Sequence, residues 1–158
     1  MIEVTQTRTG APAGNCTEAC IASILGIPIE DVPDLYDPDA DHTQQDARYP
    51  RWLRVHDWLL RVHGRKYAQI RLPPDQAFVW LDSQSGWPSS YRTEPHLLMG
   101  KNPDGIGHAV VAIGGEMVWD PNPRRRGIIE PDEVCFLLPI ACIPPEYHEW
   151  PGLDFTPG

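Results

Sequence analysis

The fold is organised around residues 14–26, which read GNCTEACIASILG. Asn15 is a favourable N-cap and Glu18 follows three residues later, at capping-box spacing, so the sequence predicts a helix that begins at about Cys16. Gly26 predicts the end of that helix. Cys16 then lies in the first helical turn, where free backbone N–H groups and the positive end of the helix dipole favour an ionised thiol.

Length and charge limit the classes of function. The chain has 158 residues, and we expect one domain over residues 1–158. Its formal net charge of -9 argues against a nucleic-acid partner. No apolar run approaches the roughly 20 residues that a membrane span needs, and the first residues lack the apolar region of a signal peptide. We therefore expect a cytoplasmic protein that binds neither nucleic acid nor membrane.

The four cysteines do not have the spacing of a disulfide framework or a zinc site. Cys16 and Cys20 are four residues apart on one predicted helix. Cys20, Cys135 and Cys142 fall in or beside apolar segments and are predicted to be small core residues. We expect no metal ion and no cofactor, so any chemistry has to come from the side chains themselves.

A second helix is predicted over residues 50–64. Trp52, Val55, Leu59 and Val62 form one apolar stripe along it. The pattern then changes to a period of two, which indicates strands. Strands are predicted over residues 2–7, 67–72, 96–100, 108–113, 116–120 and 134–140. The sequence therefore predicts an α+β fold, in which the N-terminal helix carrying the cysteine packs on a small antiparallel sheet.

Two strand positions are predicted more closely. Residues 134–140 are apolar throughout, which indicates a central strand. Gly114 and Gly115 predict a two-residue hairpin turn of type I′ or II′. In a hairpin closed in this way, Asp120 faces Ala109 and lies one position from His108. A diagonal offset or a small bulge would let its carboxylate reach the imidazole. The tail, residues 144–158, is predicted to wrap the surface without forming a strand.

Cys16, His108 and Asp120 together form a set that acyl transfer can use. A cysteine at a helix start is the nucleophile, a histidine is the base, and a carboxylate orients the imidazole. Asn122 is an alternative orienting residue. Each residue also has a structural explanation: a buried cysteine, a histidine bonded to backbone, and an aspartate that caps a turn. Their joint occurrence favours the catalytic interpretation.

Two further features bear on the substrate. Residues 124–126, Arg-Arg-Arg, run against the acidic balance of the chain. They are either a solvated hairpin end or a contact for an anionic substrate. The loops at residues 34–45 and 83–95 are the predicted specificity loops, although neither has a readable code.

The order of the motifs resembles the papain-like cysteine peptidase superfamily, especially its compact bacterial and phage-type C39-like and NlpC/P60-like members. Three segments carry the resemblance: GNC at 14–16, GHAVV at 107–111 and WDPNP at 119–123. It implies a papain-like fold, with the cysteine on a helix and the His and Asp on the sheet. It also implies an upstream Gln that donates to the oxyanion hole, for which Gln6 is the match. The Cys-Trp dipeptide of papain is absent, since Thr17 follows the cysteine.

The resemblance implies a cysteine hydrolase that cleaves a peptide, isopeptide or related amide bond through a thioester. With an acceptor other than water, the same residues would carry out transamidation. The expected partner is a peptide, a protein or another amide-containing substrate. One alternative is a catalytically silent papain-like module that binds or inhibits another protein. Another is a thiol redox protein using Cys16 and Cys20, although their i, i+4 spacing is not a redox motif.

Overall fold

A computed structural model describes residues 1–41, 49–73, 77, 89–148 and 153–155. Within these residues six strands form one sheet in the order β4-β3-β2-β5-β1-β6. Neighbouring strands are antiparallel except β1 and β6, which are parallel. The strands are β1 (Arg65–Arg71), β2 (His96–Lys101), β3 (Gly107–Ile113), β4 (Glu116–Trp119), β5 (Glu130–Pro139) and β6 (Leu153–Phe155).

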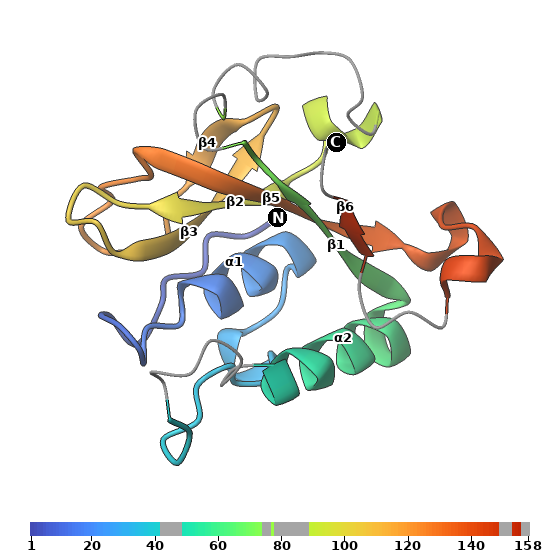
Figure 1. The fold of residues 1–158 in the computed structure, drawn as a ribbon, viewed down its shortest axis with the longest axis horizontal. Helices are drawn as coiled ribbons and strands as arrows, with labels where there is room; N and C mark the ends of the chain where they lie inside the picture. Colours follow the sequence, from blue (N-terminus) through green and yellow to red (C-terminus); the bar gives the residue numbers. More distant parts are fainter. Residues whose placement is uncertain (42–48, 74–76, 78–88, 149–152, 156–158) are drawn as a thin grey trace.

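Two α-helices, α1 (Cys16–Leu25) and α2 (Tyr49–His63), lie on the same side of the sheet (Figure 1). Helix α1 packs against β3 and β2, and α2 packs against β1. Gly26 caps α1 with φ of 72° and donates its N–H to the carbonyl of Ala22. The predicted first helix, the antiparallel sheet and the α+β class are therefore confirmed. Four short 3-10 helices complete the description: Ile29–Asp31, Ser89–Arg92, Ile140–Cys142 and Pro145–Tyr147.

Strand β5 lies between β2 and β1, which confirms its predicted central position. Cys135 and Leu137 belong to the core beneath the two helices. Val134 and Phe136 belong to a second core on the opposite face of the sheet. Because both faces of β5 are buried, this part of the strand reads as a continuous apolar run instead of alternating.

The N-terminal arm does not form the edge strand predicted for residues 2–7. The N–H of Ile2 donates to the carbonyl of Ser23 at 3.0 Å, and the N–H of Gln6 donates to the carbonyl of Pro121 at 3.0 Å. The arm is thus extended, but its partners are α1 and the chain after β4. An alternating pattern does not distinguish this arrangement from pairing with a strand.

Two predicted core positions are wrong. Val62 is 63% exposed. Val55 and Leu59 are buried, and Trp52 and Trp58 pack partly against the same core. Val62 lies in the last turn of α2, which ends at His63, and is not part of this core. Cys142 is exposed, since it ends a short 3-10 helix beyond the end of β5. Cys20 and Cys135 are buried, as predicted, and all four thiols are free.

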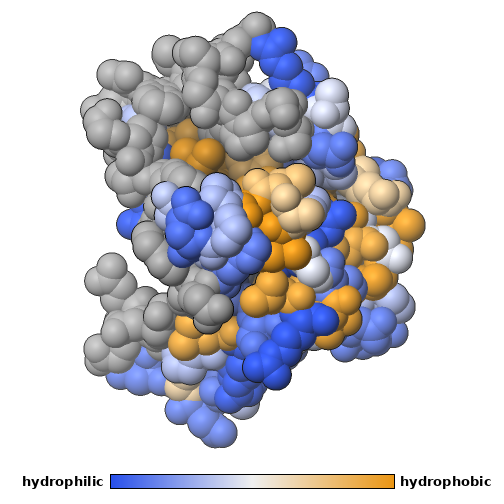
Figure 2. Space-filling view, turned by 90° about the vertical axis from the view of Figure 1, so that its right-hand side faces the viewer, coloured by the Kyte–Doolittle hydropathy of each residue, from blue (hydrophilic) through white to orange (hydrophobic). Residues whose placement is uncertain are grey.

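The prediction that residues 144–158 form no strand is also wrong. Strand β6 extends the sheet by pairing with β1, since the other side of β1 would otherwise be an open sheet edge. Figure 2 shows the side of the molecule that lies to the right in Figure 1, and apolar side chains extend over this face from its centre to its right-hand edge, with hydrophilic ones between them. Within the described residues, no helix is long and apolar enough to cross a membrane.

At Gly100 the backbone of β2 lies close to the backbone of β5. The register between these strands shifts between Met99 and Gly100. A Cβ atom added to Gly100 would lie 2.7 Å from the Cα of Pro131 and would also overlap the carbonyl of Glu130. The missing side chain therefore allows the pairing to continue into the turn that joins β2 to β3.

We expect Gly100→Ala to lower the free energy of unfolding by about 1–3 kcal/mol, because the added Cβ has to displace the backbone of β5. Gly107→Ala is the matched control, since nothing lies within 4 Å of a Cβ at that position. Urea denaturation followed by far-UV circular dichroism measures both. Equal stability of the two variants would contradict the close approach.

Candidate active site

Cys16, His108 and Asp120 are brought together by three different elements. Cys16 is the first residue of α1, His108 is the second residue of β3, and Asp120 directly follows β4. The Nε2–H group of His108 donates to Oδ1 of Asp120 at 2.8 Å. Because Asp120 occupies Nε2, Nδ1 is the nitrogen left for the thiol of Cys16, which lines the same cleft as His108 and raises the pKa of its imidazole. His108 therefore lies between the thiol and the carboxylate.

A bulge in the hairpin gives Asp120 its position. The turn is closed by Gly114 and Gly115, whose φ angles of 61° and 81° are those of a type I′ turn. The register then shifts, so that Val111 pairs with Trp119. Continued by one residue, this register moves Asp120 from its expected place opposite Ala109 to the side of the hairpin that His108 also faces. The predicted bulge is therefore present.

Asp120 is 3% exposed, and its carboxylate is fully engaged. Besides the imidazole, it accepts the backbone N–H of Asn122 at Oδ1 and that of Gly127 at Oδ2, both at 2.8 Å. The side chain of Asn122 instead accepts the N–H of Arg124. Of the two candidates for orienting His108, Asp120 therefore makes the contact and Asn122 supports the following turn.

The surroundings of His108 favour its charged form. Burial lowers its pKa, but the interactions of the imidazole with the Cys16 thiol and with the Asp120 carboxylate together outweigh burial and raise the pKa above its ordinary value. His108 is only 7% exposed, so both contacts lie in a site with little water. A protonated imidazole between a thiol and a carboxylate can stabilise the thiolate on one side and hand its proton to a bound substrate.

Gln6 reaches the same cleft as Cys16. It is 7% exposed, and its Nε2 donates to the carbonyl of Arg8 at 2.7 Å. The other N–H of that amide is not needed for this bond, and the Oε1 atom has no hydrogen-bond partner. Gln6 can therefore turn one donor toward a group bound next to the thiol.

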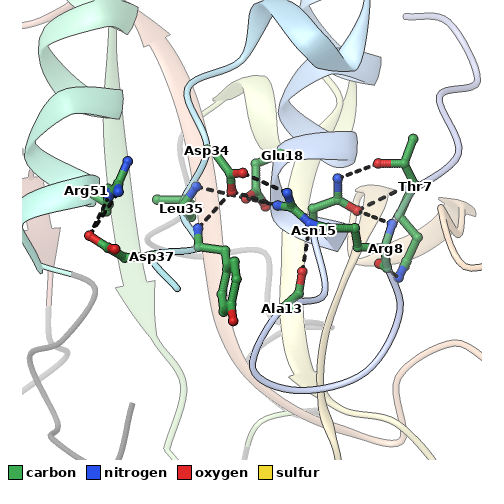
Figure 3. A network of polar contacts seen from close by, with 11 residues as sticks. Thr7, Arg8, Ala13, Asn15, Glu18, Asp34, Leu35, Asp37 and Arg51 are labelled. Atoms are coloured by element: carbon green, nitrogen blue, oxygen red, sulfur yellow. Dashed lines mark hydrogen bonds and ion pairs between the residues drawn. The ribbon is translucent and has the colours of Figure 1, made fainter. Parts of the chain in front are cut away.

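The capping box predicted from Asn15 and Glu18 does not form, because both side chains have tertiary partners. Asn15 stands at the N-cap position without capping the helix. Its Oδ1 accepts the N–H groups of Thr7 and Arg8 at 3.1 and 2.9 Å, and its Nδ2 donates to the hydroxyl of Thr7 (Figure 3). Glu18 accepts the N–H of Leu35 at 3.0 Å. Burial raises the pKa of its carboxyl, although that hydrogen bond opposes the effect.

Arg8 closes the loop that precedes Cys16. Its Nε donates to the carbonyl of Ala13 at 3.0 Å, which draws residues 9–13 into a compact loop. Its two terminal nitrogens bind the carboxylate of Asp34 at 2.7 and 2.6 Å. The hydrogen bonds between this pair raise the pKa of Arg8 and lower that of Asp34. Figure 3 shows how this pair and Asn15 support the start of α1 from two sides.

A cleft of about 350 Å³ lies over Cys16 and His108. One wall is formed by residues 9–14, and the other is formed by residues 102–107 with residues 122–126; Gln6 and Thr17 complete the lining. Sequence reasoning missed residues 9–14 and 102–107 as site loops. Residues 34–41 and 89–95, which belong to the two expected specificity loops, do not line this cleft. The other residues of these loops lie outside the described residues.

Residues 124–126 were interpreted above as either a solvated hairpin end or a contact for an anionic substrate, and the structure places the three arginines differently. Arg124 and Arg126 line the cleft. Arg126 pairs with Asp104 at 2.6 Å. Arg125 belongs to the same segment, residues 122–126, but its side chain does not line the cleft; its guanidinium lies 4.5 Å from the centre of the Trp119 ring. Among the described residues, no group of three or more His, Cys, Asp or Glu side chains could hold a metal ion.

Comparison of the chain with protein-family models, with curated proteins and with solved structures found no match.

We expect the contribution of His108 to stability to decline with rising pH. Because its pKa is raised on folding, this contribution is complete below the unfolded value of about 6.5 and is lost as pH rises through the higher folded value. The measurement is the difference in unfolding free energy between wild type and His108→Gln across this range. For His63→Gln the same difference should change with pH in the opposite direction, because burial lowers the pKa of His63. A difference for His108 that grows with pH would contradict this account.

We expect Asn15→Ala to destabilise the chain by about 0.5–1.5 kcal/mol for each of the two partly buried hydrogen bonds that it removes. Asn15→Asp retains the Oδ1 acceptor for Thr7 and Arg8 and is the matched variant. Thermal unfolding and hydrogen exchange at these two amides measure the effect. Unchanged exchange in Asn15→Ala would show that Asn15 does not hold the arm.

Proposed function

We propose that this chain is a cysteine hydrolase that cleaves an amide bond through a thioester. The observation that carries the proposal is the hydrogen bond of His108 to the buried carboxylate of Asp120, in a cleft that Cys16 and His108 both line. A nucleophile, a proton carrier and an orienting group occur there in the order that acyl transfer requires. The papain-like resemblance of the motifs supports the same reaction class.

In the first half of the reaction, the Cys16 thiolate attacks the carbonyl carbon of the bound amide. The oxygen that becomes negative is held by the N–H of Cys16, which as the first N–H of α1 has no intrahelical partner. The free N–H of Gln6 is the second donor, and each donor of this kind contributes about 2.7–4 kcal/mol. The imidazolium of His108 gives its proton to the nitrogen as the C–N bond breaks. The amine leaves, and a thioester remains on Cys16.

In the second half, neutral His108 takes a proton from a water molecule. The resulting hydroxide attacks the thioester carbon, and the bond between sulfur and carbon breaks. The acid product leaves and the thiolate–imidazolium pair is restored. An amine in place of water would give transamidation with the same residues. Throughout, Asp120 keeps Nε2 protonated and the ring in position.

The alternative is a silent module that keeps a papain-like fold for binding a partner. Such a module has no need for a buried carboxylate that accepts a hydrogen bond from a buried histidine. Burying an ionised group is costly unless it is paired. The redox alternative is less favoured, because Cys20 is fully buried on the inner face of α1.

The test is the rate of alkylation by iodoacetamide, read for each cysteine by peptide mass spectrometry. Exposed Cys142 is an internal reference within the same chain. At pH below about 8, where an ordinary thiol is mostly protonated, we expect Cys16 to react at least about ten-fold faster than Cys142. His108→Ala should bring the two rates close together. Equal rates in the wild type would contradict a ready-formed nucleophile.

Turnover separates the enzyme from the silent module. A mixed library of fluorogenic peptide amides provides the substrate, and Cys16→Ala is the blank. We expect hydrolysis by the wild type and a loss of about 10²–10⁴-fold in His108→Ala, the usual range for removing an acid–base group. A fast-reacting Cys16 with no turnover of any library member would favour the module.

A further inference from the structure

The two walls of the cleft have different chemical surroundings. Residues 9–14 form the wall on the side of Gln6, and residues 102–107 with 122–126 form the wall beside His108. If the chain works as proposed above, His108 delivers its proton to the leaving amine. The leaving part of the substrate then lies against the wall formed by residues 102–107 and 122–126, which we call the hairpin wall.

The hairpin wall carries an excess positive charge. Asp104 and Arg126 both line the cleft, and Nη1 of Arg126 lies 2.7 and 2.6 Å from the two carboxylate oxygens of Asp104. Their charges offset each other, and the pair ties the β2–β3 turn to the segment after β4. Arg124 also lines the cleft and is exposed. Among the described residues, its guanidinium has no carboxylate partner.

This positive charge is local, because the chain as a whole has 22 acidic and 13 basic residues. A protein of this balance repels anions in general. At the cleft the lining instead carries two arginines and one aspartate, before any charge on His108 is counted. The N–H of Arg124 donates to Asn122, whose own N–H donates to Asp120. The backbone that carries Arg124 is therefore held in a fixed relation to the reacting groups.

We propose that Arg124 binds a carboxylate on the leaving part of the substrate, so that the enzyme prefers amides with an acidic group beyond the scissile bond. A guanidinium offers two parallel donors that match a carboxylate. This inference rests on the proposed function and adds its specificity. The carboxylate is either an acidic side chain or the free end of a peptide, and both present the same group to Arg124.

Two alkylating reagents that differ only in charge test the proposal without a known substrate. Iodoacetate carries a carboxylate where iodoacetamide carries a carboxamide. The measured quantity is the rate ratio of iodoacetate to iodoacetamide at Cys16, divided by the same ratio at Cys142. We expect Arg124→Gln to lower this quantity about two- to five-fold, the range for an exposed ion pair. Because the quantity compares two reagents at the same thiol, a change in the reactivity of Cys16 itself cancels from it.

Arg61→Gln is the matched control, since Arg61 is an exposed arginine on α2 that does not line the cleft. It removes the same charge from the chain and should leave the ratio unchanged. Arg124→Lys should retain part of the wild-type preference. Because Arg124 is exposed, its variants are expected to fold. A ratio that falls equally in Arg61→Gln and Arg124→Gln would mean that net charge, and not Arg124, sets the preference.

A protection assay distinguishes the two sources of the carboxylate. N-acetylglutamic acid α-amide offers a side-chain carboxylate, and N-acetylalanine offers a terminal one. Protection of Cys16 from iodoacetamide by either compound, lost in Arg124→Gln, supports the proposal and names the source. Equal protection by the matching uncharged amides contradicts it.

Failure of this inference differs from failure of the proposed function. If Cys16 reacts with iodoacetamide no faster than Cys142, the proposed function is wrong and this inference is wrong with it. If Cys16 reacts fast but Arg124→Gln leaves the reagent ratio unchanged, the nucleophile stands and only the anionic preference is wrong.

Discussion

The buried carboxylate of Asp120 is the interaction on which the rest of the site depends. Removing such a group from water costs several kcal/mol unless its oxygens are matched by donors. Here three donors reach it: His108 on β3, and the N–H groups of Asn122 and Gly127. The same three bonds orient the imidazole and fold residues 120–127 into the hairpin wall. Positioning of the reacting groups and shaping of the cleft thus have one cause.

The opposite wall of the cleft is also held by one buried polar side chain, which here is uncharged. Asn15 is also buried and also accepts two backbone N–H groups, from Thr7 and Arg8. An amide next to Cys16 adds no negative charge beside the thiol, whereas the carboxylate next to His108 raises the pKa of the imidazole. Each side of the cleft is therefore set by one polar side chain whose charge suits its reactive neighbour.

Local signals predicted much of this structure. Gly26, the two glycines of the hairpin and the apolar run of β5 each act within a few residues, and the elements that they predicted are present. Long-range partners account for what was missed. The side chain of Asn15 caps no helix because the N-terminal arm reaches it first. No local sequence pattern predicts the loops that line the cleft, because their two walls come from segments that are brought together only when the sheet folds. Cys16, His108 and Asp120 could be named in advance because the proposed reaction needs particular residue types, and the structure brings His108 to Asp120 and places Cys16 and His108 in one cleft.

The bulge in β4 shows that the number of residues between His108 and Asp120 decides whether their side chains lie on the same face of the hairpin. In a hairpin with a two-residue turn, a strand without the extra residue would present Asp120 on the face opposite His108. One additional residue between them reverses that face, and a second would reverse it back. An insertion or deletion in this hairpin therefore keeps Asp120 and His108 on one face only when it involves two residues, for example one in a strand and one in the turn. In any chain built on this plan, we expect the count of residues between the imidazole and its carboxylate to vary by even steps.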